Sequence, residues 1–202
     1  MATRTVAFGV VLCALASSTA SAAILVLTDQ TVYNANTSSY TTSNEDFSVY
    51  GDFASAPSLL GSAGAVNWTA TSTGGVRVVS GTLGSATATT LTVSFSASGG
   101  VYGVSGNFWG TDAGAVIQPS FVTVRLNDGT TYLNYITAPS FVGFVSTGAA
   151  IASIDIEARN GVGAGATWYY ANVDNMSFAY VPAPGAFALL GLAGLAGLRR
   201  RR

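Results

Sequence analysis

The chain contains no histidine and no lysine, and its single cysteine, Cys13, lies in an apolar stretch near the N-terminus. Without histidine, a Ser-His-Asp triad, a histidine metal site and an HExxH motif are all excluded. Without lysine, and without cysteine after residue 22, Schiff-base and thiolate chemistry are excluded in the rest of the chain, as are disulfides and cysteine metal sites. A pair of carboxylates, as in glycoside hydrolysis, is the catalytic arrangement that remains.

Charged residues are also scarce, at 8% of the 202 residues, and most of the basic ones lie at the two ends. Between residues 23 and 180 the basic residues are Arg77, Arg125 and Arg159, against nine acidic residues, a net charge of −6. A negative fold repels phosphate backbones, so we expect no nucleic-acid partner. The length and the 49% hydrophobic content predict one domain with apolar ends.

The N-terminal segment has the order of features found in a secretory signal peptide. Arg4 precedes an apolar stretch over residues 6–16, and small residues follow with Ala20 and Ala22 in an A-x-A arrangement. This order predicts a signal helix over residues 1–22, removed by signal peptidase after Ala22 during export. A short buried helix is the alternative.

The C-terminal segment, residues 181–202, combines prolines, an apolar run and a basic end. As a helix at ~1.5 Å per residue, residues 181–198 would span about 27 Å, close to the roughly 30 Å hydrocarbon core of a membrane. Pro182 and Pro184 separate this run from the preceding domain. Four arginines would stay among cytoplasmic headgroups and stop translocation. They are Arg199, Arg200, Arg201 and Arg202.

This order of features resembles the C-terminal sorting segment of PEP-CTERM proteins of Gram-negative bacteria. The residues that match the Pro-Glu-Pro region are Val181, Pro182, Ala183, Pro184 and Gly185, with Ala183 where the family usually carries glutamate. The resemblance implies a transmembrane helix that holds the chain in the inner membrane until an exosortase processes it. The product would reach the cell surface or the extracellular space. A permanent membrane anchor is the alternative.

The region 23–180 has the pattern of a β-sheet domain. Apolar and polar residues alternate over 91–95, 121–126 and 151–158, which is typical of half-buried strands. Asn127, Asp128 and Gly129 predict a tight hairpin turn. Further strands are expected near 24–28, 66–70, 75–80, 101–109, 131–136, 141–146 and 168–180. We find no amphipathic helical pattern of useful length.

Many short strands between turn residues predict an all-β fold: an antiparallel β-sandwich, jelly-roll-like, flanked by the signal helix and the transmembrane helix. Residues 101–180 are also similar to a module of PEP-CTERM proteins, on stretches such as 141–144 and 173–175. That similarity implies a secreted β-sandwich and transfers no catalytic residue.

Two pairs of acidic residues are candidates for catalysis. Asp155 and Glu157 lie on one face of a predicted strand, roughly 7 Å apart along it, although a solvated outer face is the favoured interpretation. Glu45 and Asp46 are adjacent, so on a strand they would point apart. The glycine-rich stretch 161–165 precedes a predicted strand rather than a helix, which favours a loop over a nucleotide site.

Aromatic and oxygen-bearing side chains are the candidates for binding. Four aromatic residues are possible platforms for sugar rings, with core packing as the alternative: Trp68, Trp109, Trp168 and Tyr170. We expect no cofactor. A structural calcium ion, with turn capping as the alternative, would have as ligands Asp112, Asp128, Asp155, Asp174 and Asn175.

Three classes of function remain open. The favoured one is a non-catalytic surface or matrix protein, because the tail and the missing catalytic residues agree with it. The second is a carbohydrate-binding module of the exopolysaccharide layer, with extracellular polysaccharide as its partner. The third is a carboxylate-based glycan-cleaving enzyme.

Overall fold

The computed structural model describes residues 23–182. The signal helix and the transmembrane helix expected from the sequence lie outside these residues, as do Ala183, Pro184 and Gly185 and the four arginines. In the part that is described, 13 strands form one antiparallel sheet. The other elements are the helix α1 (Gln30–Asn36) and the 3-10 turn η1 (Ser48–Tyr50). No helix within residues 23–182 combines the length and the apolar character needed to span a membrane. The all-β antiparallel prediction is confirmed.

The strands follow the chain in this order: β1 (Ile24–Leu27), β2 (Thr41–Glu45), β3 (Phe53–Ala63), β4 (Val66–Val79), β5 (Thr82–Ser85), β6 (Leu91–Ser96), β7 (Val101–Thr111), β8 (Ile117–Gln118), β9 (Ser120–Leu126), β10 (Thr131–Ile136), β11 (Ser140–Ser146), β12 (Ser153–Arg159) and β13 (Tyr170–Tyr180).

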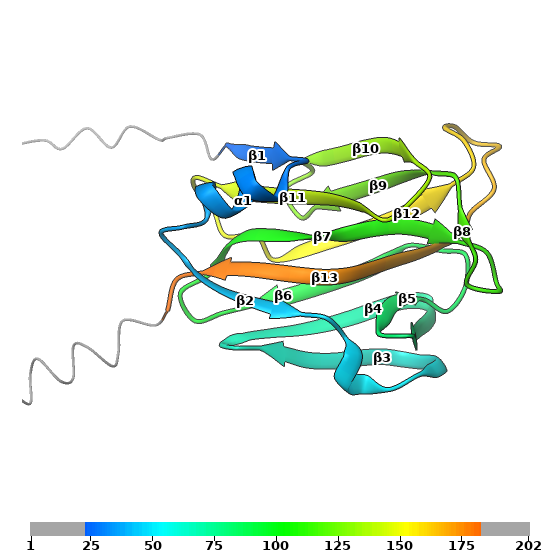
Figure 1. Ribbon diagram of the computed structural model, residues 1–202, viewed down its shortest axis with the longest axis horizontal. Coiled ribbons are helices and arrows are strands. Elements are labelled where there is room, and N and C mark those ends of the chain that lie inside the picture. The colour runs from blue at the N-terminus through cyan, green and yellow to red at the C-terminus, as the bar shows by residue number, and fades with distance from the viewer. Residues whose placement is uncertain (1–22, 183–202) are drawn as a thin grey trace, which may run out of the picture.

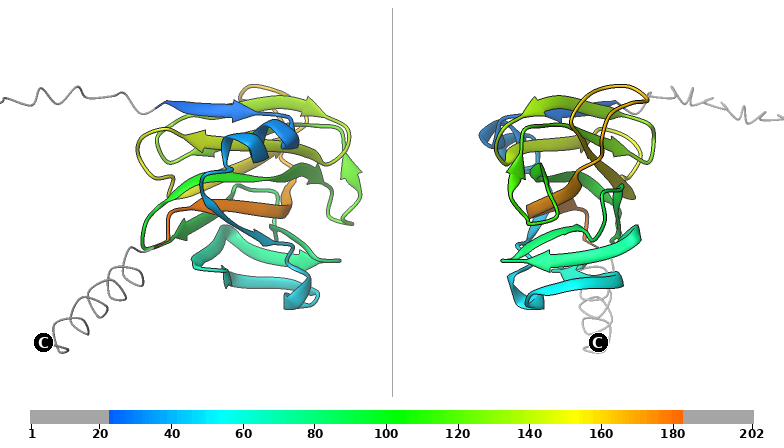
Figure 2. Two further views of the ribbon diagram at one scale, coloured as in Figure 1. Left: turned by 60° about the vertical axis from the view of Figure 1, so that its left-hand side comes forward. Right: turned by 90° about the vertical axis from the view of Figure 1, so that its right-hand side faces the viewer.

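The sheet folds back on itself so that two layers face each other (Figures 1 and 2). One layer has the strand order β1-β11-β7-β13, with β2 also paired to β13. The other has the order β4-β6-β12-β9-β10, with β3 paired to β4, and β5 joins the layers by pairing with both β13 and β4. The core lies between the layers, where the rings of Phe95 on β6 and Phe178 on β13 are 5.3 Å apart.

The alternation in the sequence places the expected residues in this core. Ile154 and Ile156 on β12 are fully buried, whereas Asp155 and Glu157 between and beyond them face outward. The predicted turn after β9 is present: Gly129 adopts a φ of 92° and donates its N–H to the Leu126 carbonyl at 3.0 Å. The glycine-rich stretch 161–165 lies in the connection between β12 and β13.

Several elements were not predicted. The ranges 66–70 and 75–80 belong to one long strand, β4, and the additional elements are α1, η1, β2, β3, β5 and β8. β3 carries Pro57 and lacks regular alternation, and its pairing with β4 shifts register beside that proline. A proline is tolerated where a strand is irregular, since it cannot donate to the ladder.

Helix α1 packs on the outer face of the layer that contains β11 and β7 (Figure 1). The Asp29 carboxylate caps it by accepting hydrogen bonds from the N–H groups of Thr31 and Val32, at 2.7 and 3.1 Å. The helix buries Tyr33 against Gly143, where a Cβ atom would collide with the tyrosine ring. A helix of seven residues is too short to be stable alone, so this contact holds it in place.

Candidate functional site

A polar groove of about 680 Å³ lies between α1 and β2, over the outer face of β7 and β13. Its amide side chains come from four elements: α1, β2, β7 and β13. These side chains are those of Gln30, Asn34, Asn44, Asn107 and Asn175. Hydroxyl groups lie among them, including those of Ser38, Ser105 and Ser177. Such a lining can donate and accept hydrogen bonds to a neutral, hydroxyl-rich ligand.

A bulge in β13 shapes one end of the groove. The pairing of β13 with β7 shifts register between Asp174 and Ser177, and Asn175 takes a left-handed φ of 51° there. The Asp174 carboxylate accepts the backbone N–H of Asn175 at 2.6 Å and so stabilises this conformation. Burial, and secondarily the charge of Asp46, raises the pKa of Asp174. The carboxylates that line the groove itself are those of Glu45 and Asp46.

Glu45 is the lining residue with the most structural bonds. Its carboxylate accepts hydrogen bonds from the Phe47 N–H at 2.9 Å, the Tyr50 hydroxyl at 3.3 Å and the Trp68 indole N–H at 3.1 Å. These bonds tie β2 and η1 to β4 beneath the groove. Glu45 therefore has a supporting role in this wall.

A pair of tyrosines lies beside the groove. Tyr40 lines it and stacks on Tyr102, with ring centroids 5.7 Å apart and an interplanar angle of 14°. Both side chains are half-buried. An aromatic ring next to polar groups is a common arrangement for holding the apolar face of a sugar. No sequence pattern predicts this pair, because Tyr40 precedes β2 and Tyr102 lies on β7, and only the fold brings the two rings together.

The four aromatic residues proposed from the sequence do not form one platform. Trp68 is 2% exposed and packs edge-on against Phe47 and Tyr50, so its ring offers no face to a ligand, and the proposed sugar-binding role is corrected for this residue. Trp109 is 8% exposed. Trp168 and Tyr170 are half-buried, and each ring is covered on one face by an arginine.

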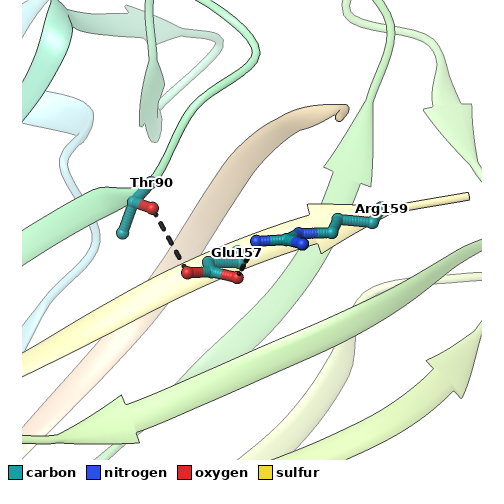
Figure 3. Close-up of polar contacts among 3 residues, drawn as sticks. All are labelled: Thr90, Glu157 and Arg159. Carbon is teal, nitrogen blue, oxygen red and sulfur yellow. Dashed lines mark hydrogen bonds and ion pairs between the residues drawn. The ribbon is translucent and has the colours of Figure 1, made fainter. Parts of the chain in front are cut away.

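Neighbouring side chains bind each acid of the proposed carboxylate pair on β12, and Figure 3 shows the contacts of Glu157. Glu157 forms an ion pair with Arg159 at 2.8 Å and accepts a hydrogen bond from Thr90 at 3.4 Å. Asp155 accepts a hydrogen bond from the Thr92 hydroxyl at 2.7 Å. Both acids lie on the outer face of the sheet. This arrangement agrees with the solvated-face interpretation.

The residues considered as calcium ligands lie in separate turns and strands. The Asp112 carboxylate accepts the N–H groups of Gly114 and Val116, at 2.9 and 3.0 Å, and closes the turn before β8. The Asp128 carboxylate accepts the Thr130 N–H at 2.8 Å in the turn after β9. Within residues 23–182, no three side chains of the types His, Cys, Asp or Glu gather in a way that could hold a metal ion.

The chain matches no family model, no curated protein and no solved structure. The functional conclusions below therefore rest on its own residues.

Proposed function

We propose that this protein is a non-catalytic, exported cell-surface or extracellular-matrix protein, sorted through its C-terminal PEP-CTERM-like segment. The observation that supports a non-catalytic role most directly concerns the nine acidic residues of the chain. Each of these carboxylates accepts at least one hydrogen bond from the fold. They are Asp29, Glu45, Asp46, Asp52, Asp112, Asp128, Asp155, Glu157 and Asp174.

These bonds are structural. They cap α1, close turns, stabilise the β13 bulge and connect β12 to β6. A general acid or base needs a carboxyl group whose proton is available to a substrate and whose pKa is tuned for transfer. Asp174 has a raised pKa, but its oxygens accept both the backbone and the side-chain N–H groups of Asn175. The sequence also lacks histidine and lysine, two of the side chains that most often transfer protons in catalysis.

We further propose that the two-layered sheet is a jelly-roll-like β-sandwich. Its support is that the chain passes from one layer to the other six times: between β2 and β3, β6 and β7, β8 and β9, β10 and β11, β11 and β12, and β12 and β13. Repeated crossing between facing layers is typical of that topology.

The sorting step has support at the edge of the described residues. β13 ends at Tyr180, and the Val181 N–H donates to the Gly100 carbonyl at 3.2 Å. Val181 is exposed, and so is Pro182. The first two motif residues thus lie at the surface, where an exosortase would find them after signal peptidase has removed the leader.

The sorting proposal is tested with two sets of substitutions in the native host. Replacing Pro182 and Pro184 should block processing but leave the arginine stop, so full-length protein accumulates in the inner membrane. Replacing Arg199 to Arg202 with glutamine should remove the stop, because an arginine costs roughly 2.5–3.5 kcal/mol at the membrane centre. Intact-mass analysis reads both results. A proline variant that matures at the wild-type mass would overturn the proposal.

The groove favours a second candidate function, binding of extracellular polysaccharide. Its amides, hydroxyls and the Tyr40–Tyr102 stack are the groups that a neutral glycan needs. Affinity electrophoresis through gels that contain the exopolysaccharide of the host tests it. Tyr40→Ala should abolish retardation, whereas Tyr135→Ala, which removes an exposed tyrosine of β10, should not. Equal retardation of the two variants would contradict a role for the groove.

A further inference from the structure

A second cleft, of about 220 Å³, opens at the other end of the sheet from Tyr180. Its polar residues are aligned with the first residues of β13, far from Tyr180. Gly84 on β5 pairs with Arg77 on one side and Asn172 on the other. Thr111 pairs with Tyr170, the first residue of β13. Arg77, Thr111 and Asn172 form its polar wall, and Trp109 and Ile117 line it with apolar surface. At ~30 Å³ per water, the volume corresponds to about seven water molecules.

Arg77 is the unusual residue in this cleft. It is 7% exposed, and its guanidinium lies 4.5 Å from the centre of the Tyr170 ring. One terminal nitrogen, Nη2, donates to the Thr111 hydroxyl at 2.9 Å, but the buried Nε has no hydrogen-bond partner. Within residues 23–182, no carboxylate forms an ion pair with Arg77. A buried charge without a counter-ion is costly, so such a group calls for an explanation, and a bound anion is one that fits an arginine.

Arg159 shows the contrast within the same fold. Its guanidinium also covers an aromatic ring, that of Trp168 at 3.7 Å, and its Nε is also without a partner. However, Glu157 neutralises it at 2.8 Å. The acid that acts on Arg77 from a distance is Asp112, and the Asp112 oxygens already accept bonds from Gly114, Val116 and Gln118.

The hydroxyl of Thr111 is arranged to help bind an anion. Its oxygen accepts from Arg77 Nη2 at 2.9 Å and from Asn172 Nδ2 at 3.0 Å. A hydroxyl oxygen has two lone pairs, so both are occupied and the O–H proton is left as a donor. The cleft therefore presents a guanidinium and a hydroxyl donor on one wall, with Trp109 beside them.

We propose that this cleft binds a carboxylate carried on a sugar ring: the carboxylate pairs with Arg77 and Thr111, and the ring contacts the apolar lining that Ile117 and the accessible edge of Trp109 provide. Arginine matches the planar carboxylate with two parallel donors, and apolar lining suits the apolar face of a sugar. The site is separate from the α1–β2 groove, and it does not rest on the export proposal. The cleft lies at the end of the sheet away from Tyr180, so a ligand could still reach it if the protein were attached through its C-terminal segment.

Isothermal titration of the full chain in mild detergent tests the proposal, with sodium glucuronate as the probe and glucose, acetate and inorganic phosphate for comparison. We expect saturable binding of glucuronate, weaker binding of acetate and none of glucose. Arg77→Gln should lower the affinity about tenfold or more, the effect of losing one charge-assisted hydrogen bond. The matched control Arg159→Gln should bind as the wild type does.

A second pair of variants keeps Arg77 in place, in case its loss impairs folding. Ile117 lines the cleft and is 42% exposed, so polar substitutions there are tolerable. Ile117→Glu should supply an internal carboxylate that competes with glucuronate, whereas Ile117→Gln should bind within a few-fold of the wild type. Polygalacturonate distinguishes a polymeric ligand from a free sugar acid. Binding per uronate unit that is tighter than the binding of glucuronate indicates a polymer, and equal binding indicates a free sugar acid.

Several outcomes would overturn the proposal. Absence of saturable glucuronate binding would do so, as would equal binding by Arg77→Gln and the wild type when both are folded. Tighter binding of phosphate than of glucuronate would assign the cleft to another anion. Equal effects of Ile117→Glu and Ile117→Gln would show that charge at the cleft does not matter.

Discussion

The indole N–H of Trp68 donates to the Glu45 carboxylate at 3.1 Å, and both side chains are almost fully buried. Glu45 belongs to β2, in the layer with β13, and Trp68 belongs to β4, in the facing layer. The bond therefore joins the two layers through a buried acid. Phe47 and Tyr50 donate to the same carboxylate, so its removal would leave three donors without a partner.

Glu45→Ala should lower the free energy of unfolding by about 3 kcal/mol or more, because each buried donor left unpaired costs about 1–3 kcal/mol. Glu45→Gln keeps an acceptor and should cost less. Urea unfolding followed by circular dichroism at neutral pH measures both. Asp128→Ala, in an exposed turn, is the control and should cost under about 1 kcal/mol. An equal loss in Glu45→Ala and Asp128→Ala would contradict the supporting role of Glu45.

Tyr33 should make stability fall at alkaline pH. Burial raises its pKa from 10.0 to about 12 in the folded protein. The unfolded chain ionises first, so this contribution is fully present below pH 10 and is lost as the pH rises from about 10 to about 12. The slope is about 1.4 kcal/mol per pH unit. Thermal melts across this range should show a smaller decline for Tyr33→Phe than for the wild type. Parallel curves would mean that Tyr33 ionises normally.

Gly143→Ala should loosen α1, because the added methyl group would meet the Tyr33 ring. We expect a loss of about 1–3 kcal/mol, the usual cost of overpacking. Gly165→Ala is the matched control, since a Cβ there meets nothing within 4 Å. Thermal unfolding compares them. In a Tyr33→Ala background the Gly143→Ala penalty should shrink, and an unchanged penalty would place the strain elsewhere.

A chain limited to residues 23–182 should fold without either end. Its support is that the buried core residues belong to elements between Ile24 and Tyr180. Circular dichroism should show a cooperative β-type transition, unchanged by reducing agent because this range contains no cysteine. A disordered product would show that the termini contribute to folding.

The sequence was informative where strands alternate and turns have special residues. β12 was predicted because Ile154 and Ile156 alternate with polar residues, and the turn at Gly129 because glycine tolerates its positive φ. The helix α1 was missed, since a short helix held by Tyr33 on Gly143 leaves little periodic signal. Whether α1 forms therefore depends on its packing against β11, which is distant in sequence.

The two binding candidates were less predictable than the fold. The groove assembles side chains from α1, β2, β7 and β13, and no local pattern brings these segments together. Arg77 did carry a signal, as one of three arginines in an acidic domain. Within residues 23–182 it forms no ion pair, and its place beside Thr111 and Tyr170 follows from the pairing of β7 with the start of β13, which no local pattern indicates.

The position of β13 also determines how this fold would respond to mechanical force. The strand runs to Tyr180 and is hydrogen-bonded along its length to β7, with β5 or β2 on its other side. If the protein is tethered beyond residue 182, tension would enter the sheet along this interior strand. The hydrogen bonds of β13 to its neighbours are perpendicular to this pulling direction. The force would therefore load them in shear, and they would have to break together rather than one after another. A surface protein of this design would resist being pulled apart by flow at its own attachment point.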